Sequence, residues 1–319
     1  MASRQECQPS GQWLLALLLA SCMAMGAVVI ATAATPLPAQ ASFTTPQEAV
    51  DALVSATRSG GTAALARILG PDGTSLIRSG DAVADRGARQ RFIAAYEDHH
   101  RIELEGSAKA VLIVGAESWP MPIPLVHTAS GWRFDTAAGR EEILDRRIGR
   151  NELAVIQVCR AYVEAQLEYA QLKVHSGGSA EYAQHFMSRG SARNGLYWPT
   201  RSGEPQSPLG PLVAQARAGG YSPGSGGGKP HPYYGYYFRI LTGQGADGPG
   251  GARSYLVDGR MTGGFALLAY PAEYGNSGIM TFTVSQDGIV FEKNLGPQTA
   301  EIAAKIERYD PDGSWSPSP

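Results

Sequence analysis

The chain of 319 residues has three cysteines and almost no net charge. Cys7 and Cys22 lie near its start, so Cys159 is the only cysteine beyond residue 41. A single cysteine excludes an intramolecular disulfide there, and its place in a helical, apolar pattern predicts a small buried side chain rather than a nucleophile. The formal net charge is −2 and no basic stripe is present, so we expect no nucleic-acid partner.

An almost unbroken apolar run occupies residues 13–34 and is followed by Ala39-Gln40-Ala41. This order of polar start, apolar middle and small-residue exit predicts a signal peptide over residues 1–41. Two alternatives stay open. The run is about the length of roughly 20 residues that spans a bilayer, so it is also compatible with an uncleaved anchor. Cys22 is the possible site of lipid attachment. We expect a periplasmic or secreted protein that meets a membrane only through this leader.

Residues 42–148 are predicted to form an N-terminal α+β domain. Thr45-Pro46-Gln47-Glu48 has the residue types of a capping box, with proline at the first helical position. Short helices are expected to follow up to Asp98. Alternating and β-branched segments then predict an antiparallel sheet with a turn at Ala129–Gly131. Glu103 and Glu105 share one face of its first strand and would be exposed if Ile102 and Leu104 form the core pair. Helices followed by such a sheet are loosely similar to the nuclear-transport-factor-2-like and cystatin-like folds.

Residues 149–319 are predicted to contain a long helix, a Gly/Pro-rich loop and a β-rich domain. The helix is expected over Ala138–Lys173 with a break at Gly149, and Gly219–Lys229 is expected to be mobile. An apolar helical face is predicted from residues recurring every three or four positions, namely Leu153, Ile156, Cys159, Val163, Leu167 and Ala170.

The β-rich part contains three strong local patterns. Tyr233–Leu241 is predicted to be one strand, and Phe265–Tyr270 is apolar on both faces, which favours a central strand covered by the long helix. Asp258-Gly259 and Asp287-Gly288 each separate two strand-like segments, as in hairpin turns. The fold class expected for the whole chain is therefore α+β.

Motifs associated with catalysis occur here in unsuitable contexts. Gly220-Tyr221-Ser222-Pro223-Gly224 matches G-x-S-x-G but lacks the preceding buried strand and the following helix of a nucleophile elbow. Residues 243–248 match G-x-G-x-x-G, but Pro249 follows where a phosphate-binding helix would begin. The histidines lack the spacing of a zinc pair. We expect no metal and no cofactor.

Several longer segments carry a resemblance to a known family. They are Gly131–Glu142, Gly195–Pro199, Gly203–Leu212, Tyr236–Thr242, Gly264–Gly275 and Gly278–Phe282. Together they resemble the exported bacterial family catalogued as domain of unknown function 2950, over roughly Phe43 to Thr299. The resemblance implies export and supplies no activity or catalytic residue.

Aromatic side chains are the candidate binding residues. Strand alternation places Tyr233 and Tyr237 on one face of the predicted strand and Tyr234, Tyr236 and Phe238 on the other. Tyr197 and Trp198 are expected to extend the first face. We therefore favour a non-catalytic envelope protein that binds a partner protein or a cell-wall glycan. The alternative is a periplasmic hydrolase or other enzyme with its site at the junction of the two domains.

Overall fold

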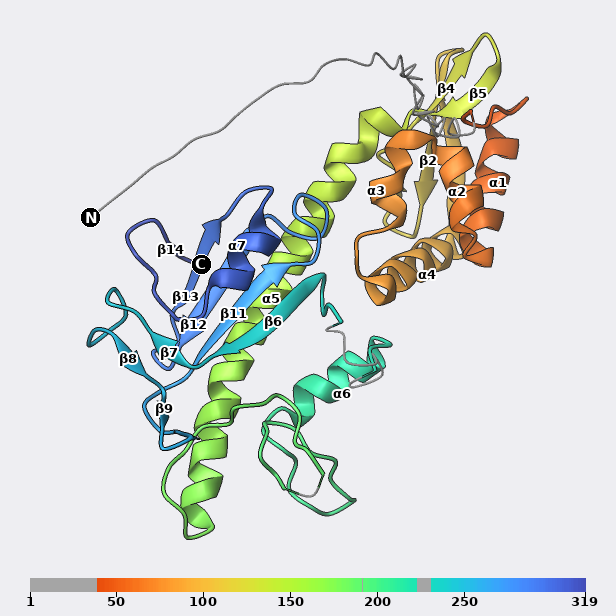
Figure 1. The fold of residues 1–319 in the computed structure, drawn as a ribbon. Helices are drawn as coiled ribbons and strands as arrows, with labels where there is room; N and C mark the ends of the chain where they lie inside the picture. Colours follow the sequence, from red (N-terminus) through yellow and green to blue (C-terminus); the bar gives the residue numbers. More distant parts are fainter. Residues whose placement is uncertain (1–38, 191, 223–230) are drawn as a thin grey trace, which may run out of the picture. The chain divides into compact units, whose positions relative to one another are not determined.

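The computed structural model describes residues 39–190, 192–222 and 231–319. Most of the predicted leader, and residues 223–229 of the loop predicted to be mobile, lie outside the described residues. Residues 38–319 form one compact unit, in which one hydrophobic core is built from residues 49–134 and another from residues 155–309. The predicted α+β class is confirmed (Figure 1). The division into domains 42–148 and 149–319 stays a prediction.

Short helices open the described chain. The predicted N-cap is confirmed, because the Thr45 hydroxyl accepts the Glu48 N–H at 3.1 Å. The Glu48 carboxylate accepts the N–H of Thr44 at 3.0 Å rather than that of Thr45, so the reciprocal bond of the predicted capping box is shifted by one residue. Gly60, with φ of +68°, ends the first helix. The elements are α1 (Pro46–Ser59), α2 (Thr62–Leu69), the 3₁₀ helix η1 (Pro71–Gly73), α3 (Thr74–Ile77) and α4 (Ala82–Asp98).

An antiparallel sheet of five strands packs with these helices. Its order is β1-β2-β4-β5, and β3 pairs with β2. Ile102 on the edge strand β1 packs against the core, but Leu104 is 66% exposed, so the two do not form a core pair. The predicted turn before Gly131 is confirmed by the pairing of Thr128 with Gly131. The strands are β1 (His100–Glu105), β2 (Lys109–Val114), β3 (Trp119–Pro120), β4 (Leu125–Thr128) and β5 (Gly131–Phe134). The likeness to the two named folds stays a prediction.

A single helix, α5 (Thr136–His175), runs for 40 residues. The predicted break at Gly149 is wrong, because packing of the flanking turns, including buried Ile148, outweighs the roughly 1 kcal/mol by which glycine disfavours a helix. Leu153 and Leu167 are exposed, so they do not belong to the buried face. The other four predicted residues, Ile156, Cys159, Val163 and Ala170, are buried as expected, and the face also includes Val155, Tyr162, Gln166 and Tyr169. No helix in the described part of the chain combines the length and apolar character needed to cross a membrane.

The second sheet is antiparallel, in the order β14-β13-β12-β11-β6, and α5 packs against β11, β12 and β13. β11 lies between two partners and its residues 266–269 are fully buried, which confirms an internal strand with two apolar faces. The strands are β6 (Tyr236–Leu241), β11 (Ala266–Pro271), β12 (Met280–Ser285), β13 (Val290–Asn294) and β14 (Ser316–Pro317). Helix α7 (Thr299–Lys305) also contacts β11.

Both predicted Asp-Gly hairpins are confirmed. Asp258 and Gly259 have φ of +51° and +76° and connect β9 to β10, while Gly288 has φ of +76° between β12 and β13. Glycine is suited to these positions because it has no Cβ to clash at positive φ. The remaining elements are β7 (Gly243–Gln244), β8 (Arg253–Ser254), β9 (Leu256–Val257), β10 (Arg260–Met261) and α6 (Gly210–Ala218).

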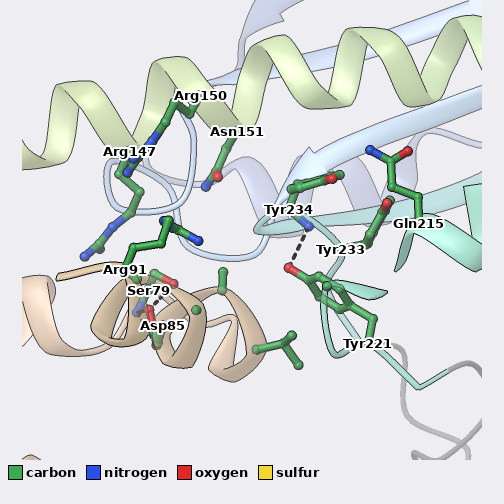
Figure 2. Close-up of a pocket in the computed structure, with 15 residues that line it drawn as sticks. Ser79, Asp85, Arg91, Arg147, Arg150, Asn151, Gln215, Tyr221, Tyr233 and Tyr234 are labelled. Carbon is green, nitrogen blue, oxygen red and sulfur yellow. Dashed lines mark hydrogen bonds between the residues drawn. The ribbon is translucent and has the colours of Figure 1, made fainter. Parts of the chain in front are cut away.

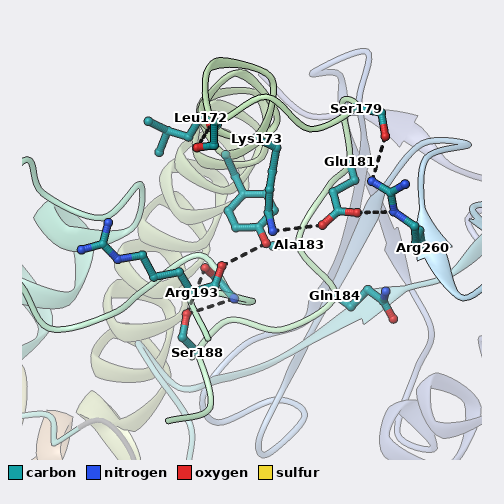
Figure 3. A network of polar contacts seen from close by, with 12 residues as sticks. Leu172, Lys173, Ser179, Glu181, Ala183, Gln184, Ser188, Arg193 and Arg260 are labelled. Atoms are coloured by element: carbon teal, nitrogen blue, oxygen red, sulfur yellow. Dashed lines mark hydrogen bonds and ion pairs between the residues drawn. The ribbon is translucent and has the colours of Figure 1, made fainter. Parts of the chain in front are cut away.

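A polar network fastens the segment after α5 to the β9–β10 hairpin (Figure 3). Glu181 bridges Lys173 at 3.1 Å and Arg260 at 2.6 Å, and Arg260 also donates to Ser179. Burial acts to raise the Glu181 pKa, but the bonds from Arg260 and Lys173 outweigh it and lower that pKa. The network therefore has a structural role.

Candidate functional site

The site begins with the residue that starts α4. Asp81 is 1% exposed, and one of its carboxylate oxygens accepts the N–H groups of Val83 and Ala84, both at 3.0 Å. This is an N-cap, which satisfies donors that the first helical turn leaves free. The other oxygen accepts the Tyr221 hydroxyl at 2.8 Å and the Gly235 N–H at 2.9 Å. One buried carboxylate thus joins α4 to two distant segments.

The segment before β6 is a tight turn rather than a strand. Tyr233 and Tyr236 exchange backbone hydrogen bonds at 2.9 and 3.1 Å, and the two residues between them, Tyr234 and Gly235, have φ of +50° and +74°. The predicted strand from Tyr233 is therefore wrong in its first three residues, because positive φ at two successive positions reverses the chain. The expected alternation of faces consequently begins at Tyr236.

Helix α5 brings a buried arginine to the same region. The Arg147 guanidinium donates to the Ser75 and Leu76 carbonyls, both at 2.7 Å, and to the Asn276 side chain at 2.5 Å. Burial lowers its pKa, and the neighbouring Asp85 carboxylate acts in the opposite direction. These bonds occupy the guanidinium, so Arg147 mainly holds the segment around η1 and α3 against α5.

These elements enclose a cavity of about 310 Å³ (Figure 2). Its polar lining comes from four separate parts of the chain: Ser79 and Asp85, Arg91, Arg147 to Asn151, and Gln215 to Tyr234. The complete lining consists of Ser79, Val83, Ala84, Asp85, Gly87, Ala88, Arg91, Arg147, Arg150, Asn151, Gln215, Gly219, Tyr221, Tyr233 and Tyr234. We call it the Arg–Tyr pocket.

The charge in the Arg–Tyr pocket is unbalanced. Asp85 is the one carboxylate in its lining, and both of its oxygens accept hydrogen bonds from Ser79, including one from the hydroxyl at 2.7 Å. Arg91 extends from α4 towards the side of the cavity formed by α5 (Figure 2). The guanidinium groups of Arg91 and Arg150 make no hydrogen bond or ion pair with another described residue. Burial lowers the Arg150 pKa, and the Arg91 charge lowers it further.

Three tyrosines form the opposite part of the lining. The ring centroids of Tyr233 and Tyr234 lie 4.3 Å apart, and those of Tyr221 and Tyr233 lie 4.8 Å apart. The Tyr233 hydroxyl is buried and has no partner at hydrogen-bonding geometry. Burial, followed by the neighbouring Tyr234 side chain, raises the Tyr233 pKa. Burial and the Asp81 charge raise the Tyr221 pKa as well, so the Tyr221 and Tyr233 hydroxyls are neutral at physiological pH.

The candidate binding residues named from the sequence are not brought together. Tyr233 lines the pocket, whereas Tyr237 lies on β6 with its ring 5.6 Å from that of Tyr270. Tyr197 and Trp198 are 7% and 8% exposed and belong to the core of the second sheet. A binding role for Tyr197, Trp198 and Tyr237 stays a prediction.

No sequence pattern predicts a site at these arginines, because the charged run over residues 141–150 is typical of a solvated helix face. That interpretation holds for Glu142 and Arg146, which form an exposed ion pair at 2.5 Å. Arg147 is half-buried and binds the carbonyls of α3, whereas Arg150, one helical turn after Arg146, is exposed and lines the pocket. A pair of basic residues three apart on a helix was the available signal, and it identifies no partner by itself.

The other motifs occupy structural positions. Residues 243 and 244 of the G-x-G-x-x-G match form strand β7, and residues 245–248 begin the loop that connects it to β8. The Gly245 N–H donates to the Tyr309 carbonyl at 2.9 Å. Residues 223 and 224 of the G-x-S-x-G match lie outside the described residues. Within the described ranges, no group of three or more His, Cys, Asp or Glu side chains is placed to hold a metal ion.

Comparison with known proteins gives one match. The sequence model of the family described as protein of unknown function (DUF2950) matches residues 40–317. No curated protein and no solved structure matches the chain.

Proposed function

The chain belongs to the DUF2950 family of proteins of unknown function, and we propose that it is an exported, non-catalytic binding protein that takes an anionic ligand in the Arg–Tyr pocket. The observation that carries this proposal is the pair Arg91 and Arg150. These two guanidinium groups line one cavity, and no carboxylate among the described residues pairs with either.

An oxyanion fits this pair for geometric and electrostatic reasons. A guanidinium presents several N–H donors in one plane, which matches the oxygens of a carboxylate or phosphate. Two neighbouring cations repel each other, and an anion between them removes that repulsion. Both arginine side chains belong to exposed residues, so a ligand can reach them from solvent. Solvent also screens the repulsion between the two arginines, so we expect the loss of one of these charges to change the stability of the unliganded protein little.

The pocket supports binding better than hydrolysis. A hydrolase that uses paired carboxylates needs two of them near the reacting bond. Asp85 is the one carboxylate in the lining, and its oxygens are occupied by Ser79. Nucleophilic catalysis needs a nucleophile next to a base. The lining has no histidine or cysteine, and Ser79, whose hydroxyl donates to Asp85, is only 2% exposed. The enzyme alternative has no comparable support.

Anion binding is tested by thermal unfolding of the purified protein in phosphate and in chloride at equal ionic strength. Phosphate should raise the melting temperature, because a ligand that binds only the native state stabilises it. Arg91→Gln and Arg150→Gln should each abolish this rise. Arg146→Gln is the matched control, since it removes a charge one turn away that is paired with Glu142. If both pocket variants retain the wild-type rise, the anion site is wrong.

Export is a separate part of the proposal and rests on the apolar run at residues 13–34. The predicted cleavage after Ala41 would remove Gln40, whose side-chain amide donates to the Phe134 carbonyl at 2.7 Å and to the Ile68 carbonyl at 3.0 Å. We still expect a mature protein that begins near Ser42 and resides in the periplasm. Intact mass of the protein from fractionated cells tests this. A retained apolar run or a lipid on Cys22 would show that the protein is instead membrane-anchored.

A further inference from the structure

Tyr234 has an unfavourable backbone conformation. Its φ is +50°, the left-handed region in which a residue with a large side chain is uncommon. The turn that contains it needs positive φ at both central positions, and glycine or asparagine normally fills the first of them. A non-glycine residue held in such a region costs on the order of 1–3 kcal/mol. Stability alone would therefore favour another residue at position 234.

The surrounding contacts hold the turn in place despite this cost. The Tyr234 N–H donates to the Tyr221 hydroxyl at 3.3 Å (Figure 2), and the Gly235 N–H donates to Asp81 at 2.9 Å. Gly235 has no room for a side chain, because an added Cβ would lie 2.8 Å from Asn151 Nδ2 and 2.9 Å from Ser277 Cβ. The turn is thus fixed on both sides, and it places the Tyr234 ring at the pocket.

The position of the ring suggests a reason for its presence. Tyr234 lines the same cavity as Arg91 and Arg150, and its ring centroid lies 6.2 Å from that of Tyr221. Strained backbone of this kind is concentrated at ligand-binding and active sites. An aromatic face beside two cations suits a ligand that has both a flat or ring-shaped apolar surface and an acidic group.

The rest of the lining favours a sugar as that ring. Asn151 donates one amide hydrogen to the Ser277 carbonyl at 2.8 Å, which leaves its amide oxygen available to accept a hydrogen bond from a ligand. Gln215 and the buried Tyr233 hydroxyl add further hydrogen-bonding groups to the lining. Hydroxyl groups around a sugar ring match such a set, since each of them both donates and accepts. A volume of about 310 Å³ is at the small end for ligand sites, which suits one ring.

We propose that the Arg–Tyr pocket binds an acidic monosaccharide unit, with the ring against Tyr234 and the oxyanion between Arg91 and Arg150. This rests on the proposed anion site and specifies its ligand. The oxyanion is a carboxylate, as in a uronic acid, or a phosphate ester on the sugar. Both present oxygens in the same way to a pair of guanidinium groups.

The test is calorimetric titration of the purified protein with D-glucuronate, D-glucose 6-phosphate, D-glucose, acetate and inorganic phosphate at one ionic strength. At least one acidic sugar should bind about tenfold tighter than the small anion of the same type, a gain of about 1.4 kcal/mol. Glucose should bind weakly. Tighter binding of glucuronate than of glucose 6-phosphate would identify a carboxylate ligand, and the reverse order a phosphate ester.

Variants at position 234 separate the role of the ring from that of the arginines. Tyr234→Asn should remove the tenfold preference, retain acetate or phosphate binding, and raise the melting temperature, because asparagine tolerates positive φ. Tyr234→Phe keeps the ring and should keep the preference.

Two results would overturn the inference. If acidic sugars and small anions bind wild-type protein equally, and Arg150→Gln abolishes both, the anion site stands and the sugar ligand is wrong. If Tyr234→Asn binds acidic sugars as the wild type does, the ring is not the sugar-binding face. Failure of every anion to bind would overturn the proposed function as well.

Discussion

Asparagine in place of Asp81 is expected to lower the free energy of unfolding by about 2–3 kcal/mol. Asparagine is as good an N-cap as aspartate, so its side-chain oxygen can still accept the N–H groups of Val83 and Ala84. Its NH₂ group then replaces the oxygen that accepts the Tyr221 hydroxyl and the Gly235 N–H. The Tyr221 hydroxyl can rotate and accept a hydrogen bond from the new amide group. The Gly235 N–H can only donate, so it loses its acceptor.

The magnitude follows from that difference. A hydrogen bond to a charged group contributes about 1.5–3 kcal/mol, and a buried donor left without a partner costs about 1–3 kcal/mol. Gly235 is buried, so its N–H has no water to replace the lost acceptor. Asp81→Ala removes the cap too and should cost about 1 kcal/mol more than Asp81→Asn. Tyr221→Phe removes only the hydroxyl's bond to the Asp81 carboxylate and should cost about 1.5 kcal/mol, at the low end of that range.

Urea unfolding of the purified protein, followed by far-ultraviolet circular dichroism, measures these differences. The expected order of midpoints is wild type, Tyr221→Phe, Asp81→Asn and then Asp81→Ala. If Asp81→Asn unfolds at the wild-type midpoint, Asp81 acts only as a cap, and the connection between α4 and the tyrosine turn contributes nothing to stability.

Three further predictions concern other parts of the fold. Gly259→Val and Gly288→Val should each lower the free energy of unfolding in urea by about 1–3 kcal/mol, because open space surrounds both positions and only the positive φ opposes a side chain. Gly259→Asn should be tolerated, and wild-type midpoints for both valine variants would refute the hairpin assignment. Burial raises the pKa of the Cys159 thiol to about 12, and the Arg160 charge acts in the opposite direction. A variant that lacks both leader cysteines should therefore react with a thiol reagent at pH 8 only after unfolding, and rapid reaction of the native protein would contradict this. Because the Glu181 pKa is lowered, its ion pairs stabilise the fold above the ordinary carboxyl pKa of about 4.3 and are lost as the pH falls through the folded-state pKa. Glu181→Gln should therefore be less stable than the wild type at pH 7 and lose less stability on acidification. Parallel profiles of stability against pH for the two proteins would show that the network does not contribute to stability.

Local sequence patterns predicted the elements whose cause is local. The N-cap at Thr45 and the turns at Gly259 and Gly288 depend on a few adjacent residues and were predicted correctly. Gly149 and Tyr233 were misjudged for the opposite reason. Packing of the whole helix overrides the glycine, and distant partners such as Asp81 hold the turn at Tyr234 and Gly235.

The Arg–Tyr pocket could not be predicted from spacing in the sequence. Its lining combines residues as far apart as Ser79 and Tyr234, and the contact between Asp81 and Gly235 joins positions separated by 154 residues. Tyr233 was selected as part of an aromatic strand, so it is in the site for a reason different from the one that suggested it. The sequence did favour a site at the junction for the enzyme alternative, but not the arginines that give this one its charge.

The Arg–Tyr pocket contains two features that do not favour the stability of the protein, and the two have separate physical origins. One is electrostatic, since Arg91 and Arg150 face the same space with no carboxylate paired to either. The other is conformational, since Tyr234 has positive φ in a turn suited to glycine or asparagine. Neither depends on the other, because one arises from α4 and α5 and the other from the turn before β6. A ligand with both a ring and an acidic group would account for the two features together, whereas packing requirements would account for neither. This coincidence is the reason for assigning function to the Arg–Tyr pocket rather than to the better-packed aromatic residues Tyr197 and Trp198.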